Sequence, residues 1–442
     1  MSGSIVRPPG PKGRRYLQSP LLSGSGPLVN LPQMAARYGD TSFWQFLHIS
    51  TYFFAHPNDI ETVLVTKYRS FTKGIGTRAN PELLGNGLLT SEGDYWFRQR
   101  RLSQPAFHRT RIAIYADIMA AEAERMMNHW QDGQQIDIHR EMMRTTLAIT
   151  TQALFGIELG PRMTVVAQAM NDFIRQNSKL SVWRLFFKVP TPQRRRFLLG
   201  VRALDKIVYD IIRERRTRGL GEDFLSDLLR AQDLDGSSMS DQQLRDEVMT
   251  MLLAGHETTA LALSWAWFLL GTYPDAQAKL HAELDKALGD RLPTATDFPQ
   301  LLYTQNVVRE SIRLYPPAWV ISRRAAENVQ VGGYILPAGS NVIVSPWVTH
   351  HDERFFADPN RFLPERWSAE NENNLARYAY FPFGGGPRVC IGNNFALMEA
   401  AILLAAVGRR FQVSLAPGHA VEPMPSITLR PARGVHVRIN RR

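Results

Sequence analysis

Cysteine is almost missing from this chain: a single residue, Cys390, stands among 442. One cysteine excludes an intramolecular disulfide and every site built from several thiolates, such as a zinc finger or an iron–sulfur cluster. A lack of disulfides is typical of a protein that works in a reducing compartment. Any thiolate chemistry must therefore take place at Cys390.

Long uninterrupted apolar runs are also missing. The most apolar stretch, 249–271, is broken by His256, Glu257 and two threonines, which are costly to place in lipid. The basic N-terminal segment is interrupted by prolines and glycines before it offers the apolar run of about 7–15 residues that a signal peptide needs. We therefore expect a soluble protein of the cytoplasm with no integral membrane segment.

Acidic residues are fewer than basic ones, since 41 Asp and Glu face 52 Lys and Arg, a formal net charge of +11. Such an excess is compatible with a nucleic acid or an anionic membrane as partner. The basic residues are mostly dispersed, however, and no nucleic-acid recognition module accompanies them. We expect no nucleic-acid partner and favour a solvated basic surface that helps to dock an acidic protein.

Apolar residues at 44% and charged residues at 21% are ordinary for a globular protein, and a chain this long can enclose a cofactor. We expect residues 1–40 to be an irregular, Pro- and Gly-rich lead and 41–442 to form one domain. The fold class is predicted to be mainly α with a minor β subdomain. The pattern predicts a hairpin at 41–54 and short antiparallel strands at 329–348. It predicts helical regions at 95–289, 301–314 and 394–409.

The most informative stretch is 383–392, Phe-Gly-Gly-Gly-Pro-Arg-Val-Cys-Ile-Gly. In isolation a lone cysteine is most often an inert buried residue. Here the glycines let a flat, bulky partner approach the backbone around the sulfur. The helix expected after Cys390 and the charge of Arg388 favour the thiolate form. We therefore expect a depressed pKa of the thiol and a sulfur ligand for a metal.

This stretch resembles the Phe-x-x-Gly-x-Arg-x-Cys-x-Gly signature of the cytochrome P450 family at every fixed position. The resemblance implies the cytochrome P450 fold as a single domain, with heme b (iron protoporphyrin IX) as cofactor. It implies that Cys390 is the thiolate ligand of the haem iron and that Arg388 pairs with a haem propionate. Phe383 and Gly392 are then expected beside the ring, close to the sulfur.

Two further segments resemble the family's propionate-binding parts. Trp96 and Arg100 lie one helical turn apart and are similar to its Trp-x-x-x-Arg pair, although a core tryptophan beside a surface arginine is the simpler interpretation without the cysteine loop. Ser322–Ala325 resembles the strand that presents another arginine to a propionate. Arg323 aligns better there than Arg324.

Residues 254–259, Ala-Gly-His-Glu-Thr-Thr, interrupt a long apolar helix. Glycine costs about 1 kcal/mol relative to alanine in a helix interior, and a threonine bonded to the preceding turn bends the axis, so a kinked buried helix is one interpretation. The resemblance implies another, an oxygen-binding groove in which Ala254 and Gly255 make room for dioxygen. In that groove Thr258 would hydrogen-bond the bound oxygen, and Glu257 would relay protons from solvent.

Glu310 and Arg313 are three residues apart on a predicted helix. Such a pair contributes little on a surface, but the apolar flanks favour burial, and a buried guanidinium requires a further partner. The segment Pro364–Trp367 resembles the part of the family that supplies a second arginine, here Arg366. The resemblance implies that the three charged residues form a structural lock behind the cysteine loop.

Substrate contacts are expected from Leu89, Ala254, Ala318 and Val320, although ordinary core packing explains an apolar residue equally well at each position. An apolar lining favours a hydrophobic substrate, such as a fatty acid, terpenoid, steroid or aromatic compound. The segment 163–187 is predicted to be a lid over the pocket.

These features predict a haem-thiolate monooxygenase that inserts one atom of dioxygen into a hydrophobic substrate by hydroxylation or epoxidation. We expect a bacterial-type monomer without a fused reductase, which receives electrons from NAD(P)H through a separate reductase and a ferredoxin or flavodoxin. A peroxide-dependent peroxygenase or a haem-thiolate isomerase of the same fold is the alternative, although such relatives generally replace the acid–threonine pair. A haem-based ligand sensor is the non-enzymatic alternative, and a basic nucleic-acid-binding protein with an inert cysteine is the most remote.

Overall fold

The computed structural model describes residues 6–11, 26–46, 48–74, 81–178, 191–231, 236 and 238–442. The second part of the predicted lid, 179–187, lies outside the described residues. The helices are α1 (Pro27–Tyr38), α2 (Pro57–Glu61), α3 (Pro81–Leu84), α4 (Gly93–Ser103), α5 (Arg109–Met127), α6 (Ile138–Phe155), α7 (Arg162–Ser178), α8 (Pro192–Arg218), α9 (Phe224–Arg230), α10 (Asp241–Thr272), α11 (Pro274–Leu288), α12 (Leu302–Leu314), α13 (Pro346–Thr349), α14 (Ala369–Asn374) and α15 (Asn393–Arg410).

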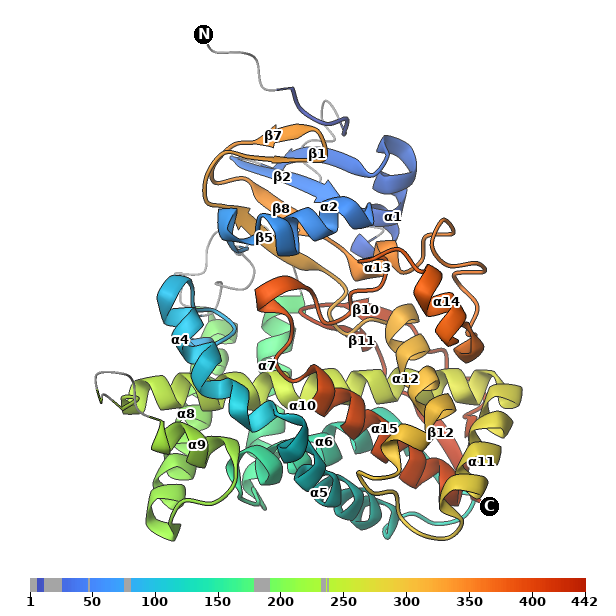
Figure 1. Ribbon diagram of the computed structural model, residues 1–442. Coiled ribbons are helices and arrows are strands. Elements are labelled where there is room, and N and C mark those ends of the chain that lie inside the picture. Colours follow the sequence, from blue (N-terminus) through green and yellow to red (C-terminus); the bar gives the residue numbers. More distant parts are fainter. Residues whose placement is uncertain are drawn as a thin grey trace.

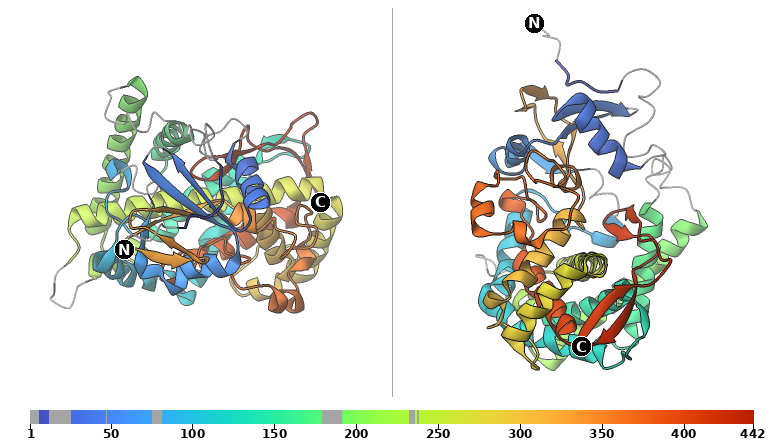
Figure 2. Two further views of the ribbon diagram at one scale, coloured as in Figure 1. Left: turned by 90° about the horizontal axis from the view of Figure 1, so that it is seen from above. Right: turned by 90° about the vertical axis from the view of Figure 1, so that its right-hand side faces the viewer.

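The longest helix, α10, runs through the middle of the helical part, and in the right-hand view of Figure 2 it is seen end-on with other helices around it. A capping box starts it, because the Ser240 side chain accepts a bond from the Gln243 N–H while the Gln243 side chain accepts one from the Ser240 N–H. Its buried residues occur on all sides, as expected for a central helix.

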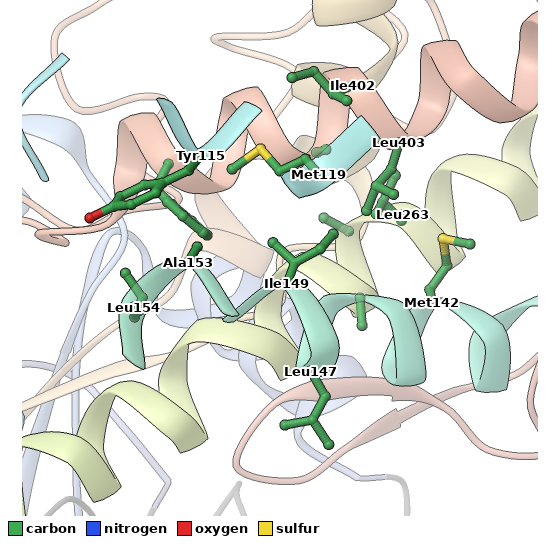
Figure 3. Close-up of a cluster of buried hydrophobic side chains, with 14 of the residues drawn as sticks. Tyr115, Met119, Met142, Leu147, Ile149, Ala153, Leu154, Leu263, Ile402 and Leu403 are labelled. Atoms are coloured by element: carbon green, nitrogen blue, oxygen red, sulfur yellow. The ribbon is translucent and has the colours of Figure 1, made fainter. Parts of the chain in front are cut away.

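The main core lies where α5, α6, α10 and α15 meet (Figure 3). Ile149 of α6, Leu263 of α10 and Leu403 of α15 point toward one another there and are fully buried. Each such side chain contributes about 1.5–3 kcal/mol through removal from water. This packing fixes α10 and α15, the two helices that flank the cysteine loop.

The strands form a small β part at one end of the molecule and further short pairs (Figure 1). They are β1 (Thr41–Phe46), β2 (Ile49–Phe54), β3 (Phe71–Lys73), β4 (Gln135–Asp137), β5 (Ile321–Ala325), β6 (Val329–Val331), β7 (Tyr334–Leu336), β8 (Asn341–Val344), β9 (Phe411–Leu415), β10 (Pro423–Pro425), β11 (Leu429–Pro431) and β12 (His436–Arg441). The predicted hairpin is confirmed as β1–β2. Of the strands predicted in 329–348, β6 and β7 are antiparallel, whereas β8 pairs in parallel with β2 and antiparallel with β5.

The prediction that residues 1–40 are irregular is wrong for their last part, which forms α1. Pro27 occupies the first helical turn, where its missing N–H costs nothing. Leu31 and Met34 are buried in a cluster with residues of β1 and β2. Tertiary packing therefore stabilises a helix that the local composition did not indicate.

Candidate active site

Cys390 opens into a cavity of about 370 Å³ between α10, β5 and the loop that precedes α15. The residues predicted for cofactor, oxygen and substrate line this cavity, with one exception, Glu257. They are Leu89, Trp96, Arg100, Ala254, Thr258, Ala318, Val320, Arg323, Phe383, Arg388, Cys390 and Gly392.

The cysteine loop is folded back on itself, since the Cys390 N–H donates to the Phe383 carbonyl at 2.9 Å. Gly386 has a φ of +65°, and a Cβ there would lie 2.2 Å from the Leu64 carbonyl oxygen. A Cβ on Gly385 would lie 2.4 Å from the Tyr378 ring. At these two positions glycine is thus required by the protein's own packing and not only by a flat partner.

The expectation of a depressed thiol pKa is wrong for the protein by itself. Burial raises the pKa of Cys390 above its ordinary value, and the Gly392 N–H and the charges of Arg100 and Lys73 oppose this shift only in part. Arg388 does not reach the sulfur but pairs with Glu92. The thiolate therefore needs a stronger charge than the chain supplies, and a bound metal ion would be sufficient.

Basic side chains gather at one edge of the cavity, where Lys73, Arg100, Arg323 and Arg388 all line it. Lys73 and Arg323 lie directly opposite each other on the antiparallel strands β3 and β5. Burial and the charges of Arg323 and Arg388 lower the pKa of Lys73 to about 7, and burial lowers the pKa of Arg323 to about 10.

Two of these basic side chains have partners within the chain. Arg388 lies 4.3 Å from the centre of the Trp96 ring and donates to the Ser91 carbonyl at 3.1 Å, and Arg100 donates to the Val389 carbonyl at 2.8 Å. The carboxylate of Glu92 acts electrostatically on both Lys73 and Arg323. Because like charges directly opposite each other on paired strands are destabilising, the edge is built for an anionic ligand.

The wall of the cavity opposite the sulfur is formed by α10. Ala254 and Thr258 are open to the cavity, and the Thr258 hydroxyl donates to the Ala254 carbonyl at 2.9 Å, the back-bond that bends helices. Gly255 also lines the cavity, but a Cβ there would lie 3.1 Å from Thr150 Cγ2 of α6. Close packing of α10 on α6 is therefore a second reason for this glycine.

Glu257 is directed away from the cavity and into the protein. Its Oε1 atom accepts a bond from the Thr428 hydroxyl and one of 2.9 Å from Arg430 Nε. The Nη2 atom of Arg430 lies 2.8 Å from the same oxygen. His256 is buried beside this pair and donates from Nδ1 to the Leu252 carbonyl at 2.6 Å, and it does not belong to the lining of the cavity that Cys390 enters.

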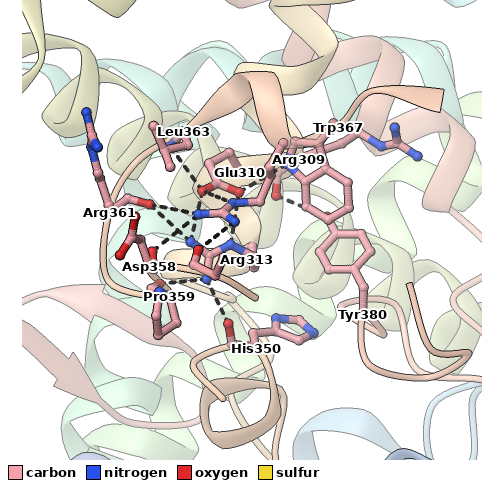
Figure 4. A network of polar contacts seen from close by, with 12 residues as sticks. Arg309, Glu310, Arg313, His350, Asp358, Pro359, Arg361, Leu363, Trp367 and Tyr380 are labelled. Carbon is pink, nitrogen blue, oxygen red and sulfur yellow. Dashed lines mark hydrogen bonds and ion pairs between the residues drawn. The ribbon is translucent and has the colours of Figure 1, made fainter. Parts of the chain in front are cut away.

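The three charged residues predicted to form a lock lie in one network (Figure 4). Glu310 bonds Arg313 at 2.8 and 2.9 Å and Arg366 at 2.8 Å. Arg313 and Glu310 are fully buried, and Arg313 also donates to the carbonyls of His350 and Pro359 at 2.7 Å. The second partner that a buried guanidinium requires is therefore present.

A scan against family models matches residues 8–437 to the family described as Cytochrome P450. The chain belongs to the cytochrome P450 family. It is 40% identical over 416 residues to cyclooctatin synthase of Streptomyces melanosporofaciens, covering 92% of this chain and 90% of the relative. It is 36% identical over 373 residues to cyclooctat-9-en-7-ol 5-monooxygenase of the same organism (83% and 81% covered) and 34% identical over 429 residues to pentalenene oxygenase of Streptomyces avermitilis (95% and 92% covered).

The P450 fold is also found in solved structures. The haem domain of cytochrome P450DA matches 99% of this chain and 98% of its own with a TM-score of 0.88 at 27% sequence identity. The predicted fold class is thereby confirmed, and so is the assignment to a family of oxidoreductases with named monooxygenases. Among the described residues no helix combines the length and the apolar character that crossing a membrane requires.

The cavity fits the haem that membership of the P450 family implies. Its walls are largely apolar, one thiol enters it, and its basic edge calls for carboxylates, which match a porphyrin, its iron and its propionates. No cluster of three or more His, Cys, Asp or Glu that suits a metal ion occurs in the part of the chain that the structure describes.

Sequence reasoning missed Lys73, Glu92, Thr428 and Arg430. Lys73 and Glu92 flank a glycine-rich loop without any motif, and no local signal distinguishes them from surface charges. Arg430 lies 173 residues after its partner Glu257, so only the folded chain reveals the pair.

Proposed function

We propose that this P450 is a monooxygenase that hydroxylates or epoxidises a hydrophobic substrate with dioxygen and electrons from a separate protein. For hydroxylation the balance is RH + O₂ + 2e⁻ + 2H⁺ → ROH + H₂O. The observation that carries the proposal is the lone thiol of Cys390, which opens into an apolar cavity opposite Ala254 and Thr258 of α10. When bound, the haem would supply dioxygen binding and activation.

Residues of the chain would hold the haem at its iron and at its propionates. Cys390 would hold the iron as thiolate, while Phe383 and Gly392 would keep the sulfur beside the ring. Trp96 and Arg100 would meet a propionate together with Arg323, Arg388 and Lys73. Because Lys73 and Arg323 lie directly opposite each other, the carboxylates of the haem would stabilise the basic edge of the cavity.

Thr258 and Glu257 would transfer the protons that the reaction consumes. The Thr258 hydroxyl is open to the cavity and bonds its own helix at Ala254, from where it can turn toward a bound oxygen. Glu257 directly precedes Thr258 in the sequence and would pass protons from solvent toward the Thr258 hydroxyl. Replacement of Thr258 by Ala is expected to leave haem binding unchanged and to lower the product formed per dioxygen consumed.

The substrate is proposed to be a cyclic terpenoid. Leu89, Ala254, Ala318 and Val320 give one part of the cavity wall an apolar surface, and such a surface selects for shape and not for polar groups. The names of two relatives, cyclooctat-9-en-7-ol 5-monooxygenase and pentalenene oxygenase, support the same class, because both describe oxygenation of unsaturated hydrocarbon skeletons. The electron donor is proposed to be a ferredoxin or flavodoxin reduced by an NAD(P)H-dependent reductase.

Two spectroscopic measurements test this function. The reduced, carbon-monoxide-bound protein is expected to show the Soret maximum of thiolate ligation, and Cys390→Ser is expected to lose that maximum and all product formation. Titration with a panel of terpenoids, fatty acids and steroids is expected to give a high-spin shift of the Soret band with terpenoids. A parent spectrum typical of histidine ligation, or a Cys390→Ser variant as active as the parent, would contradict the proposal.

A further inference from the structure

The ion pair between Glu257 and Arg430 lies between two separate cavities. On one side, the neighbouring residues Ala254 and Thr258 line the cavity that Cys390 enters. On the other side, His256 and Arg430 line a second cavity of about 720 Å³, which is bounded by α6 and α7. Glu257 lines neither cavity, but its neighbours in α10 line the first and its ion-pair partner Arg430 lines the second.

The second cavity leads from the surface to this ion pair. Its outer lining includes Arg140 of α6 and Gln168 and Asn171 of α7, which are exposed. Its inner lining includes His256 and Arg430, which are 1% and 7% exposed. Polar groups therefore occur at both ends of the second cavity, and water enters a space that offers such partners.

Two histidines near the inner end of the second cavity have lowered pKa values. Burial lowers the pKa of His139 to about 4, and burial also lowers the pKa of His256. Both imidazoles are therefore neutral, and His139 lies 3.0 Å from the Ser264 hydroxyl. The other charged groups of this cavity, Asp137, Arg140 and Arg144, belong to α6 and the strand before it.

We propose that the second cavity is the entrance through which protons reach Glu257 from solvent, and that Arg430 is the positioning residue that holds Glu257 at its inner end. The inference rests on the monooxygenase function proposed above, because that reaction takes up two protons in every turnover. Substrate and haem occupy the other cavity, so protons arrive without crossing the apolar substrate site.

Arg430 can position the Glu257 carboxylate because it contacts one of the two carboxylate oxygens and because its own strand is fixed to α10. Within the described residues, the contacts of the Glu257 carboxylate all fall on Oε1, from Thr428 and from Nε and Nη2 of Arg430, which leaves Oε2 to carry a proton. The strand β11 that bears Arg430 is itself tied to α10, since Trp265 Nε1 donates to the Leu429 carbonyl at 3.0 Å.

The decisive test compares two oxidants in the haem-loaded protein. With dioxygen and a redox chain the two protons must come from solvent, whereas with hydrogen peroxide the oxidant brings them (RH + H₂O₂ → ROH + H₂O). For Arg430→Met we expect the product per dioxygen consumed to fall to roughly a tenth, a smaller loss than the about 100-fold that removal of a general acid costs. Peroxide-driven turnover is expected to stay close to that of the parent.

Controls separate positioning from a structural role. Arg430→Lys keeps the charge and is expected to restore most of the coupling, while Arg438→Met, the same change at an exposed arginine of β12, is expected to have no effect. If Arg430→Met couples as well as the parent, or if both oxidants fail equally, the role of Arg430 is refuted. Should Arg430→Met not retain haem, Thr428→Val removes another donor to Glu257 and carries the same expectation.

The entrance itself is tested on α7. Ala167 lines the second cavity and is exposed, so Ala167→Trp is expected to slow dioxygen-driven turnover and to increase its solvent deuterium isotope effect without changing the substrate spin shift. Val165→Trp is the matched control, because Val165 is 42% exposed on the same helix and does not belong to this lining. Equal effects of both substitutions would refute the entrance. A parent that converts no substrate with either oxidant would instead contradict the monooxygenase function on which the inference rests.

Discussion

At the scale of single residues, Lys73 has the clearest electrostatic consequence. Its ordinary pKa of 10.5 falls to about 7 in the folded chain. Between these two values the unfolded chain binds the proton and the folded chain does not, so the free energy of unfolding of the apoprotein rises with pH from about 7 to about 10.5. Carboxylates bound at the basic edge would favour the protonated form of Lys73 in the folded chain and would thus oppose this lowering of its pKa.

We therefore expect Lys73→Met to act in opposite directions with and without haem. In the apoprotein it should raise the free energy of unfolding at pH 7 and flatten the rise toward pH 10, because the buried cation is gone. In the haem-loaded protein it should speed the loss of haem to an acceptor protein. Urea unfolding across this pH range and haem-transfer rates measure both effects. Lys286→Met, at an exposed site on α11, should change neither.

Among residues, those of the cysteine loop could be predicted from the sequence because their signal is local. Cys390, Arg388 and Phe383 lie within ten positions of a segment that resembles the family signature, and all three line one cavity. The pKa of Cys390 could not be predicted, since the burial that raises it comes from the surrounding fold. The partner of Arg388 was also unpredictable, because Glu92 is 296 residues away.

At the scale of elements, the contact between α6 and α10 depends on Gly255. A larger side chain there would meet Thr150, whose Cγ2 would lie 3.1 Å from the Cβ. We expect Gly255→Val to lower the free energy of unfolding by about 1–3 kcal/mol through overpacking. The double variant with Thr150→Ala should recover part of that loss. Strictly additive effects in this double-mutant cycle would contradict the contact.

The network that ties α12 to the segment before the cysteine loop gives a second prediction. Glu310→Gln leaves the guanidinium of Arg313 buried without a carboxylate, which costs about 3–5 kcal/mol. Thermal unfolding should show this loss together with release of haem. The half-exposed pair of Arg309 with Glu372 provides the control, since Glu372→Gln should cost less than about 1 kcal/mol. Equal losses would mean that Glu310 is not a structural centre.

At the scale of the whole molecule, the basic residues of α4 are candidates for docking an acidic partner protein. The helix α4, whose Arg100 reaches the cysteine loop, also carries Arg98 and Arg101. We expect Arg98→Glu to slow reduction by an acidic ferredoxin at low ionic strength, with the difference disappearing in high salt. Stopped-flow reduction rates measure this, and Arg438→Glu on β12, at the other side of the view in Figure 1, is the control. An unchanged rate at low salt would remove α4 from the docking surface.

The overall architecture could be predicted only as far as its elements carry local patterns. The helix α15, which follows Cys390, and the helix α10 were predictable because both are long and mainly apolar segments. Helix α1 was not, since its formation depends on packing against β1 and β2. The same holds for the second cavity, which exists only because α6, α7 and β11 converge on α10.

The order of the chain has a consequence for its biogenesis. Arg100 is made 289 residues before Val389, the carbonyl of which it binds beside Cys390. A nascent chain on the ribosome therefore presents α4 and the apolar helix α10 for a long interval before the cysteine loop emerges. We expect chaperones to hold this intermediate and cofactor capture to follow translation, so that cells short of porphyrin accumulate full-length but protease-sensitive protein.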